Sequence, residues 1–197
     1  MRIVVVGATG TIGGAVVDAL ASRHEILRIG NKTTAITVDL AKPDSIRAMY
    51  KATGMVDAVI SAAGLAKFSP LAKLRDDDFA FSLSNKLMGQ VNLVRFGFDH
   101  MRDNGCFVLT SGILARSPMP GSAAISLVNA GVEGFARAAA IEAPRGIRVN
   151  VVSPPWVKET LQALGMDPTN GLPSVTVAKA FVRAVEGNEN GAVIEPA

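Results

Sequence analysis

The sequence predicts a single α/β domain over residues 1–197, built on a doubly wound parallel sheet of about seven strands with helices on both faces. Short runs rich in Val and Ile alternate with longer stretches of helical periodicity along the whole chain. The short runs are continuously apolar, as in parallel strands that are buried on both faces. Many of the 19 glycines stand where a predicted strand meets a predicted helix. The expected arrangement is therefore Rossmann-like.

The predicted elements follow from runs of β-branched residues and from helical spacing of apolar residues. The predicted strands cover residues 2–7, 25–30, 35–40, 57–62, 106–111, 147–153 and 192–195. The predicted helices cover about 11–22, 44–53, 76–102, 122–142 and 174–187. The segment 165–174 is rich in Gly and Pro and predicts a surface loop rather than a domain boundary.

Composition excludes several functional classes. Hydrophobic residues make up 49% of the chain, which predicts a globular rather than a disordered protein. The net charge is +3, and no run of Lys or Arg indicates nucleic-acid binding. The lone cysteine, Cys106, lies in an apolar run and predicts a core residue, with no disulfide within the chain. We predict no metal site.

The sequence also predicts a cytoplasmic location. The first predicted strand begins at residue 2, which leaves no room for a targeting segment before it. No uncharged apolar stretch reaches the roughly 18 residues that a membrane span needs. We therefore expect no membrane association.

A glycine-rich turn joins the first predicted strand to the first predicted helix. In GATGTIGG, Gly7 permits the tight turn, Gly10 lacks the Cβ that would block a pyrophosphate, and Gly13 lets helix and strand pack closely. Phosphates would then lie at the helix N-terminus, where free N–H groups favour anions. The residues expected to bind a dinucleotide here are Gly7, Thr9, Gly10, Thr11, Ile12 and Gly13. The alternative is a tight turn that binds nothing.

The end of the second predicted strand indicates which dinucleotide is bound. An NAD site usually has Asp or Glu there, to bind the ribose 2′-hydroxyl. Here the sequence reads IGNKT, with Asn31 and Lys32 and no carboxylate, and Arg28 is nearby. A cation suits a 2′-phosphate, so NADP(H) is favoured over NAD(H). Lys32 could instead be a solvated loop residue.

Motifs spread along the chain resemble the short-chain dehydrogenase/reductase family. They are GATGTIG, Asp39-Leu40, Ser61-Ala62-Ala63-Gly64, Leu109-Thr110-Ser111, Pro120-Gly121 and GIRVNVVSP at 146–154. The resemblance covers nearly the whole chain and implies that Asp39 contacts the adenine amine and that Val157 faces the nicotinamide. It places Leu40, Ala62, Gly64 and Pro154 in the cofactor site as well. Asp39 could instead be only a turn residue at the strand end.

The chain departs from this family at the catalytic positions. The family's Tyr-x-x-x-Lys pair, in which the Tyr is the acid and the Lys holds the ribose, falls on Ile125 and Asn129. The family's serine falls on Gly112, one residue past Ser111. Its catalytic asparagine falls on Lys86 and its Pro-Gly after the sixth strand on Pro154-Pro155. The only tyrosine, Tyr50, is expected on the adenine side and cannot replace the missing acid.

Three residues remain as candidates for chemistry. A partly desolvated Lys86 could stabilise an oxyanion or supply a proton, unless it is exposed or paired. Ser111 could donate a hydrogen bond to a carbonyl, or be only a strand-end hydroxyl. Asn129 could bond the cofactor ribose but brings no charge. The short segment between Val157 and the helix near 174 predicts a trimmed lid and an open site.

Three functions are therefore weighed. The first is an NADP(H)-dependent oxidoreductase that transfers hydride to a small carbonyl, quinone or activated alkene without the Tyr/Lys pair. The second is a catalytically inactive NADP(H) redox sensor, and the third is a structural subunit. The Ala- and Gly-rich helix at 122–142, together with 76–102, predicts a homodimer or homotetramer.

Overall fold

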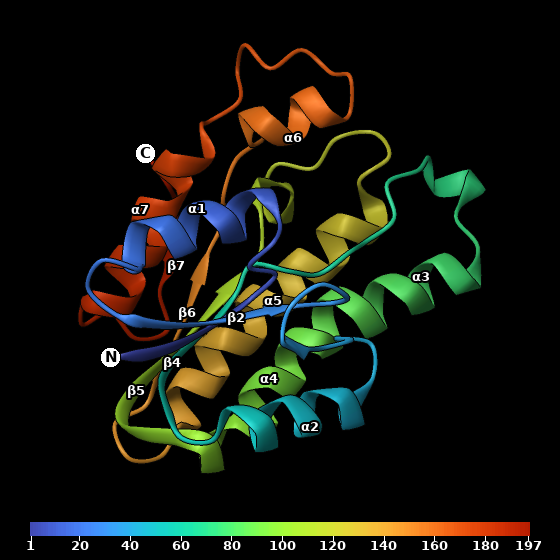
Figure 1. Cartoon of the computed structure of the whole chain (residues 1–197). Coiled ribbons are helices and arrows are strands. Elements are labelled where there is room, and N and C mark those ends of the chain that lie inside the picture. Colours follow the sequence, from blue (N-terminus) through green and yellow to red (C-terminus); the bar gives the residue numbers. More distant parts are fainter.

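The computed structural model describes all 197 residues and contains one seven-stranded sheet in the order β3-β2-β1-β4-β5-β6-β7 (Figure 1). The strands are β1 Arg2–Val6, β2 Glu25–Gly30, β3 Ile36–Thr37, β4 Val56–Ser61, β5 Met101–Thr110, β6 Arg148–Val152 and β7 Val193–Ile194. Every neighbouring pair is parallel. The predicted doubly wound, Rossmann-like sheet is confirmed. Its strand order reverses between β1 and β4, which creates a crevice at their carboxyl ends.

Helices cover both faces of the sheet (Figure 1). They are α1 Thr11–Leu20, α2 Pro43–Thr53, α3 Asp76–Ser82, α4 Gly89–Gly97, α5 Ala123–Glu142, α6 Lys158–Ala163 and α7 Ser174–Glu186. Buried residues of α1 and α7 form one apolar cluster with the sheet. Buried residues of α2, α4 and α5 form a second cluster on the opposite face.

The predicted helix at 76–102 is wrong as one continuous element. The chain forms α3, then a π-helical segment Leu83–Met88, then α4 and a 3₁₀ turn Phe98–His100. Its last two residues belong to β5, where Met101 pairs with Val56. Close packing occurs at the end of α4, because a Cβ on Gly97 would lie 2.6 Å from the Tyr50 hydroxyl. The short helix α6 was not predicted, and β3 is shorter than expected.

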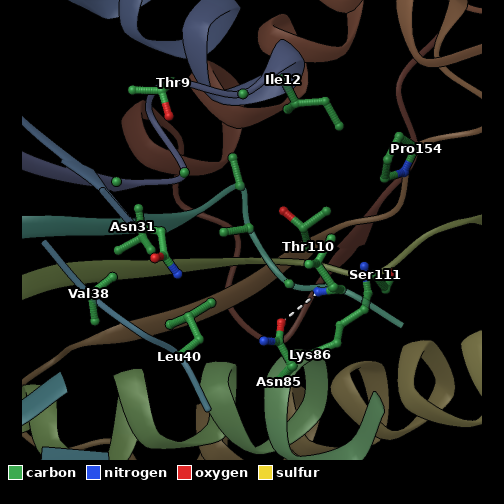
Figure 2. Close-up of a pocket in the computed structure, with 18 residues that line it drawn as sticks. Thr9, Ile12, Asn31, Val38, Leu40, Asn85, Lys86, Thr110, Ser111 and Pro154 are labelled. Carbon is green, nitrogen blue, oxygen red and sulfur yellow. Dashed lines mark hydrogen bonds between the residues drawn. The ribbon is translucent and has the colours of Figure 1, made fainter. Parts of the chain in front are cut away.

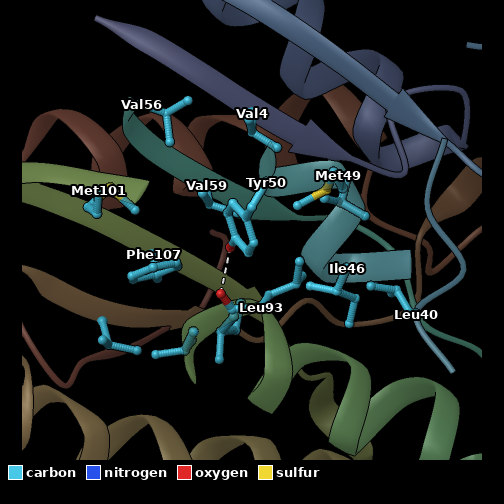
Figure 3. Packing of buried hydrophobic residues seen from close by; sticks show 14 of the residues in the cluster. Val4, Leu40, Ile46, Met49, Tyr50, Val56, Val59, Leu93, Met101 and Phe107 are labelled. Atoms are coloured by element: carbon cyan, nitrogen blue, oxygen red, sulfur yellow. Dashed lines mark hydrogen bonds between the residues drawn. The ribbon is translucent and has the colours of Figure 1, made fainter. Parts of the chain in front are cut away.

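Tyr50 lies in the core and not in a binding site (Figure 3). Its hydroxyl donates a hydrogen bond to the Leu93 carbonyl oxygen at 2.5 Å, and its ring stacks on His100. Burial raises the pKa of Tyr50 far above its usual value. The expectation that Tyr50 does not replace the missing acid agrees with this position. Cys106 is also buried, as predicted.

One helix, α5, is long and apolar enough to cross a membrane by length and composition alone. In this fold it is a core helix. Val132, Ala136 and Ala139 belong to the apolar cluster against the sheet. The same helix carries Asn129 and Glu133, both buried.

Candidate functional site

A pocket of about 420 Å³ lies at the carboxyl ends of β1, β2, β4 and β5, where the strand order reverses (Figure 2). It is lined by Val6, Gly7, Thr9, Gly10, Ile12, Gly30, Asn31, Val38, Leu40, Ala62, Ala63, Gly64, Leu65, Asn85, Lys86, Thr110, Ser111 and Pro154. We call it the groove. In open α/β sheets this switch point is where ligands bind.

The glycine-rich turn forms one wall of the groove. Gly7 has a φ of +83°, and a Cβ there would lie 2.7 Å from the Ala62 carbonyl oxygen. A Cβ on Gly13 would collide with the Gly7 carbonyl, whereas one on Gly10 would meet only the Gly7 oxygen at 3.4 Å. Gly10 therefore keeps space open toward the groove. No side chain caps the N-terminus of α1, so its first N–H groups remain available to an anion.

The expected adenosine contacts are only partly brought together. Asn31 and Leu40 line the groove, but Asp39 and Lys32 do not. The Asp39 carboxylate accepts a hydrogen bond from the Ala41 amide at 3.1 Å and pairs with Lys42 at 3.5 Å. Asp39 thus has the geometry of a turn residue. Lys32 is exposed on the loop after β2.

Lys86 reaches the groove from the π-helical segment Leu83–Met88. π-helical turns frequently occur at functional sites. The lysine stem crosses Gly64, because a Cβ on that glycine would lie 3.0 Å from Lys86 Cγ. The preceding Asn85 accepts a hydrogen bond from the Leu65 amide at 2.7 Å, which fixes the loop after β4 to this helix (Figure 2).

Lys86 is half-buried and has no ionic partner. Burial lowers its pKa to about 8, and no nearby charge contributes to that shift. An ammonium with a pKa this close to neutrality remains mostly protonated at pH 7 and can release its proton readily. Lys86 therefore has the properties of a proton donor or of a partner for a negative oxygen.

A second pocket, of about 220 Å³, adjoins the groove and shares Ile12, Lys86, Ser111 and Pro154 with it. We call it the side pocket. Its other lining residues are Gly112, Ile113, Leu114, Ile125, Asn129, Pro155, Trp156, Val157 and Thr160. Its walls are mostly apolar, and Ile125 is one of them. The Trp156 ring meets the edge of Phe68 at a centroid distance of 6.5 Å.

Asn129 is 2% exposed, and its Oδ1 atom has no hydrogen-bond partner. Its amide nitrogen lies close to Gly112, where a Cβ would come within 3.1 Å of it. A buried carbonyl oxygen without a donor costs about 1–3 kcal/mol of stability. No backbone or side-chain donor of the chain offsets that cost.

Ser111 is oriented by a buried carboxylate. Its hydroxyl donates to Glu133 Oε1 at 2.8 Å, and Glu133 is 4% exposed. Glu133 Oε2 lies 3.3 Å from Arg116 and 3.6 Å from Arg137, so its charge is compensated. The proton of Ser111 is thus committed to Glu133, and its oxygen can accept a hydrogen bond from a ligand. The expected donation from Ser111 to a carbonyl does not match this geometry.

Most of the expected site residues do gather at these pockets. The groove or the side pocket is lined by Gly7, Thr9, Gly10, Ile12, Asn31, Leu40, Ala62, Gly64, Lys86, Ser111, Ile125, Asn129, Pro154 and Val157. Thr11, Gly13, Lys32 and Asp39 line neither. No group of three or more His, Cys, Asp or Glu side chains forms a metal site.

Sequence reasoning missed Glu133 and Trp156. Glu133 stands four residues after Asn129 in a largely apolar helix, and that spacing puts both on one face. Trp156 follows Pro154-Pro155 directly after β6, at the carboxyl edge of the sheet. Both positions carry a recognisable pattern that could have identified them.

The fold and the glycine-lined groove define a dinucleotide-binding type of α/β protein. Over residues 9–194 the chain matches the family described as enoyl-(acyl carrier protein) reductase, and it belongs to that family, within the short-chain dehydrogenases/reductases. The expected family is thereby confirmed.

Two curated relatives are enzymes of longer chain. The chain is similar to a hydroxynaphthalene reductase of Aspergillus fumigatus, with 30% identity over 167 residues, 79% of this chain and 61% of that protein. It is also similar to the oxidoreductase UcpA of Escherichia coli, with 28% identity over 142 residues, 68% of this chain and 54% of that protein. The chain therefore spans less than two thirds of either relative.

Among solved structures, the protein lin1944 of Listeria innocua has 40% identity and a TM-score of 0.96, with 100% of both chains covered. A small-chain dehydrogenase in complex with NADPH has 22% identity and a TM-score of 0.87, covering 99% of this chain and 95% of that one. A short-chain dehydrogenase of Burkholderia cenocepacia in complex with NADP has 24% identity and a TM-score of 0.84, covering 98% and 95%. The last two likenesses are likenesses of fold.

Proposed function

We propose that the protein is an NADP(H)-dependent oxidoreductase that transfers hydride to a small carbonyl, quinone or activated alkene without the usual Tyr/Lys pair. The observation that carries this proposal is the continuity of the groove with the apolar side pocket at Lys86 and Ser111. A cofactor in the groove and a substrate in the side pocket would meet at these two residues.

The residues present fit a dinucleotide. The open space at Gly10 and the uncapped start of α1 suit a pyrophosphate. The unpartnered Oδ1 of Asn129 suits a ribose hydroxyl, which would donate to it. Val157, in the side pocket, would face the nicotinamide. When bound, the cofactor supplies or accepts the hydride.

We favour NADP(H) over NAD(H) because the loop after β2 has no carboxylate for a ribose 2′-hydroxyl. Lys32 is exposed there and free to reach a 2′-phosphate. Two proteins of the same fold were solved with NADPH or NADP. An adenine contact from Asp39 is not part of the proposal, because its carboxylate is used in the turn.

The site favours acceptors that need little acid catalysis. Ile125 donates no proton, and a positioned general acid usually contributes about 10²–10⁴-fold to a rate. Lys86 takes over part of this role by stabilising negative charge on an oxygen in the side pocket. Electron-poor carbonyls, quinones and activated alkenes fit that weaker assistance.

The proposal is tested by calorimetric titration with NADPH and NADH. We expect NADPH to bind more tightly than NADH, and Gly10→Ala to weaken NADPH binding by about tenfold or more, because the methyl group occupies phosphate space. Gly134→Ala is the matched control, since a Cβ there meets nothing within 4 Å. If neither NADPH nor NADH binds, the proposal is contradicted.

A redox sensor is the second candidate, because Ile125 and Asn129 replace the family's acid and its lysine. A sensor must bind a partner with different affinity in its NADPH and NADP⁺ forms. The deciding measurement is NADPH oxidation with the three acceptor classes. If any of them supports oxidation, and Lys86→Ala loses that oxidation while it still binds the nucleotide, the protein is an enzyme.

A further inference from the structure

Lys86 is the only charged residue among the linings of the groove and the side pocket. The two pockets therefore share one positively charged side chain and have no negatively charged one. Figure 2 places Lys86 and Ser111 on the side of the groove away from Thr9 and the glycine-rich turn. Phosphates held at that turn would lie apart from the Lys86 ammonium.

No side chain of the protein neutralises this cation. Lys86 forms no ion pair, and burial is the only cause of its lowered pKa. Glu133, whose partner Ser111 lines both pockets, is already bonded to Ser111 and faces Arg116 and Arg137. A half-buried charge without a partner is unfavourable, so a ligand that brings an anionic oxygen gains from pairing with it.

The walls of the side pocket specify the rest of the ligand. Ile113, Leu114 and Ile125 offer only apolar contacts, and Trp156 adds an aromatic face. Because the Ser111 hydroxyl donates its proton to Glu133, its oxygen can only accept a hydrogen bond from a ligand. A hydroxyl group on the ligand could donate that bond. The pocket thus matches an apolar body with an anionic oxygen and a neighbouring oxygen that alternates between carbonyl and hydroxyl.

We propose that the side pocket binds an apolar compound whose reacting carbonyl stands next to a carboxylate, as in a 2-oxo acid, and that Lys86 pairs with the carboxylate. This inference rests on the proposed function, because the carbonyl is the group that the nicotinamide would reduce. The adjacent carboxyl group also keeps the carbonyl electron-poor, which suits a site without tyrosine. The reduction takes a hydride from NADPH and a proton from solvent water, and Ser111 then accepts a hydrogen bond from the hydroxyl of the resulting 2-hydroxy acid.

The test uses Trp156, the only tryptophan of the chain, as a reporter inside the side pocket. The protein is saturated with NADP⁺, so that no reduction occurs, and titrated with 4-methyl-2-oxopentanoate or with its neutral methyl ester. We expect the acid to change the Trp156 emission with a Kd about tenfold or more below that of the ester.

The variants assign this preference to Lys86. Lys86→Met should abolish the preference for the acid, and Lys86→Arg should retain most of it. Lys179→Met removes an exposed lysine on α7 and should leave both Kd values unchanged. Far-ultraviolet circular dichroism confirms that each variant is folded.

Three results overturn the inference: equal affinity for acid and ester, no binding of the acid, or an acid preference that survives Lys86→Met. The nucleotide titration described above is read separately. If NADPH binds and the acid does not, this inference fails while the proposed function stands. If no nucleotide binds, the proposed function fails, and this inference fails with it because it rests on that function.

Discussion

Asn129 shows how one residue connects stability with binding. Its Oδ1 atom is buried at the wall of the side pocket without a donor. The folded protein bears the cost of that atom, and in the proposed complex a ribose hydroxyl of the nucleotide would supply the missing donor. Such local losses of stability are common where a protein must bind.

Asn129→Leu should therefore stabilise the free protein and weaken nucleotide binding. We expect a Tm higher by roughly 2–4 °C, which corresponds to about 1 kcal/mol in a chain of this size, together with a raised Kd for NADPH. Asn150→Leu is the matched control. The Asn150 amide donates to the Glu189 carbonyl and accepts from the Ala192 amide, so its removal should lower Tm. A lower Tm for Asn129→Leu would contradict this account.

Lys86 gives the stability of the protein a dependence on pH. Its pKa is lowered from 10.5 to about 8 in the folded state, so the unfolded chain holds this proton more tightly. The cost of the charged lysine is fully present below pH 8 and disappears as pH rises from about 8 toward 10.5.

Lys86→Met should accordingly raise Tm at pH 7, and the gain should shrink at pH 10. Thermal unfolding of both proteins at the two pH values measures this difference. Lys179→Met should show no such change between the two conditions. A gain of equal size at both pH values would mean that removal of charge is not the cause.

At the scale of elements, a side chain of α6 bonds directly to the start of α7. Both carboxylate oxygens of Glu159 accept hydrogen bonds from the Ser174 amide, at 3.1 and 3.0 Å, and Oε1 also accepts from the Ser174 hydroxyl at 2.8 Å. This contact caps the start of α7 and, together with a backbone hydrogen bond from Lys158 N–H to the Leu172 carbonyl at 2.9 Å, holds the segment that follows Val157. That segment borders the side pocket through Val157 and Thr160.

Glu159→Ala should make the segment between Val157 and α7 more mobile. Amide hydrogen exchange over residues 158–172 should become faster, while exchange in β1 and β4 stays unchanged. Glu142→Ala, at an exposed position on α5, serves as the control. Unchanged exchange over 158–172 would show that Glu159 does not hold the segment.

The same contact depends on pH. Burial opposes ionisation of Glu159, but hydrogen bonds from its own backbone and from Ser174 outweigh it, so its pKa is lowered. The contribution of the contact is present above pH 4.5 and is lost as pH falls through the lowered folded-state pKa.

At the scale of the whole molecule, we predict a homodimer or homotetramer. The helix α5 exposes Leu127 at 50% and Ile141 at 87%, although its other face is buried against the sheet. Light scattering at micromolar concentration should give at least twice the chain mass of 20.5 kDa. Leu127→Arg should lower that mass, whereas Leu164→Arg, at an exposed position next to α6, should not. A sharp monomer peak for the unaltered protein contradicts the prediction.

The sheet could be predicted because buried parallel strands have runs rich in Val and Ile, as in β1, β4 and β6. The start of β5 could not, because the polar residues 102–104 precede its apolar part. The six residues of α6 are too few for a helical period to be read against the Gly- and Pro-rich stretch that follows. The local sequence pattern thus predicts the main strands and helices but misses short elements and the polar ends of strands.

Some parts of the candidate site could be predicted from the sequence, and others could not. The glycine-rich turn could be predicted because its chemistry lies in consecutive backbone positions. The contact between Ser111 and Glu133 could not, since it depends on how α5 packs against the end of β5. Asp39 was assigned by resemblance to the adenine site, but its carboxylate is used in a local turn.

The groove and the side pocket would together form one NADP(H)-dependent site. A crystal structure of the protein soaked with NADP⁺ tests this most directly. We predict that the pyrophosphate lies at Gly10 and the start of α1, and that a ribose hydroxyl donates to Asn129 Oδ1, with the nicotinamide at Val157. An empty groove at millimolar NADP⁺, or a nucleotide that leaves Asn129 Oδ1 without a donor, would contradict the account.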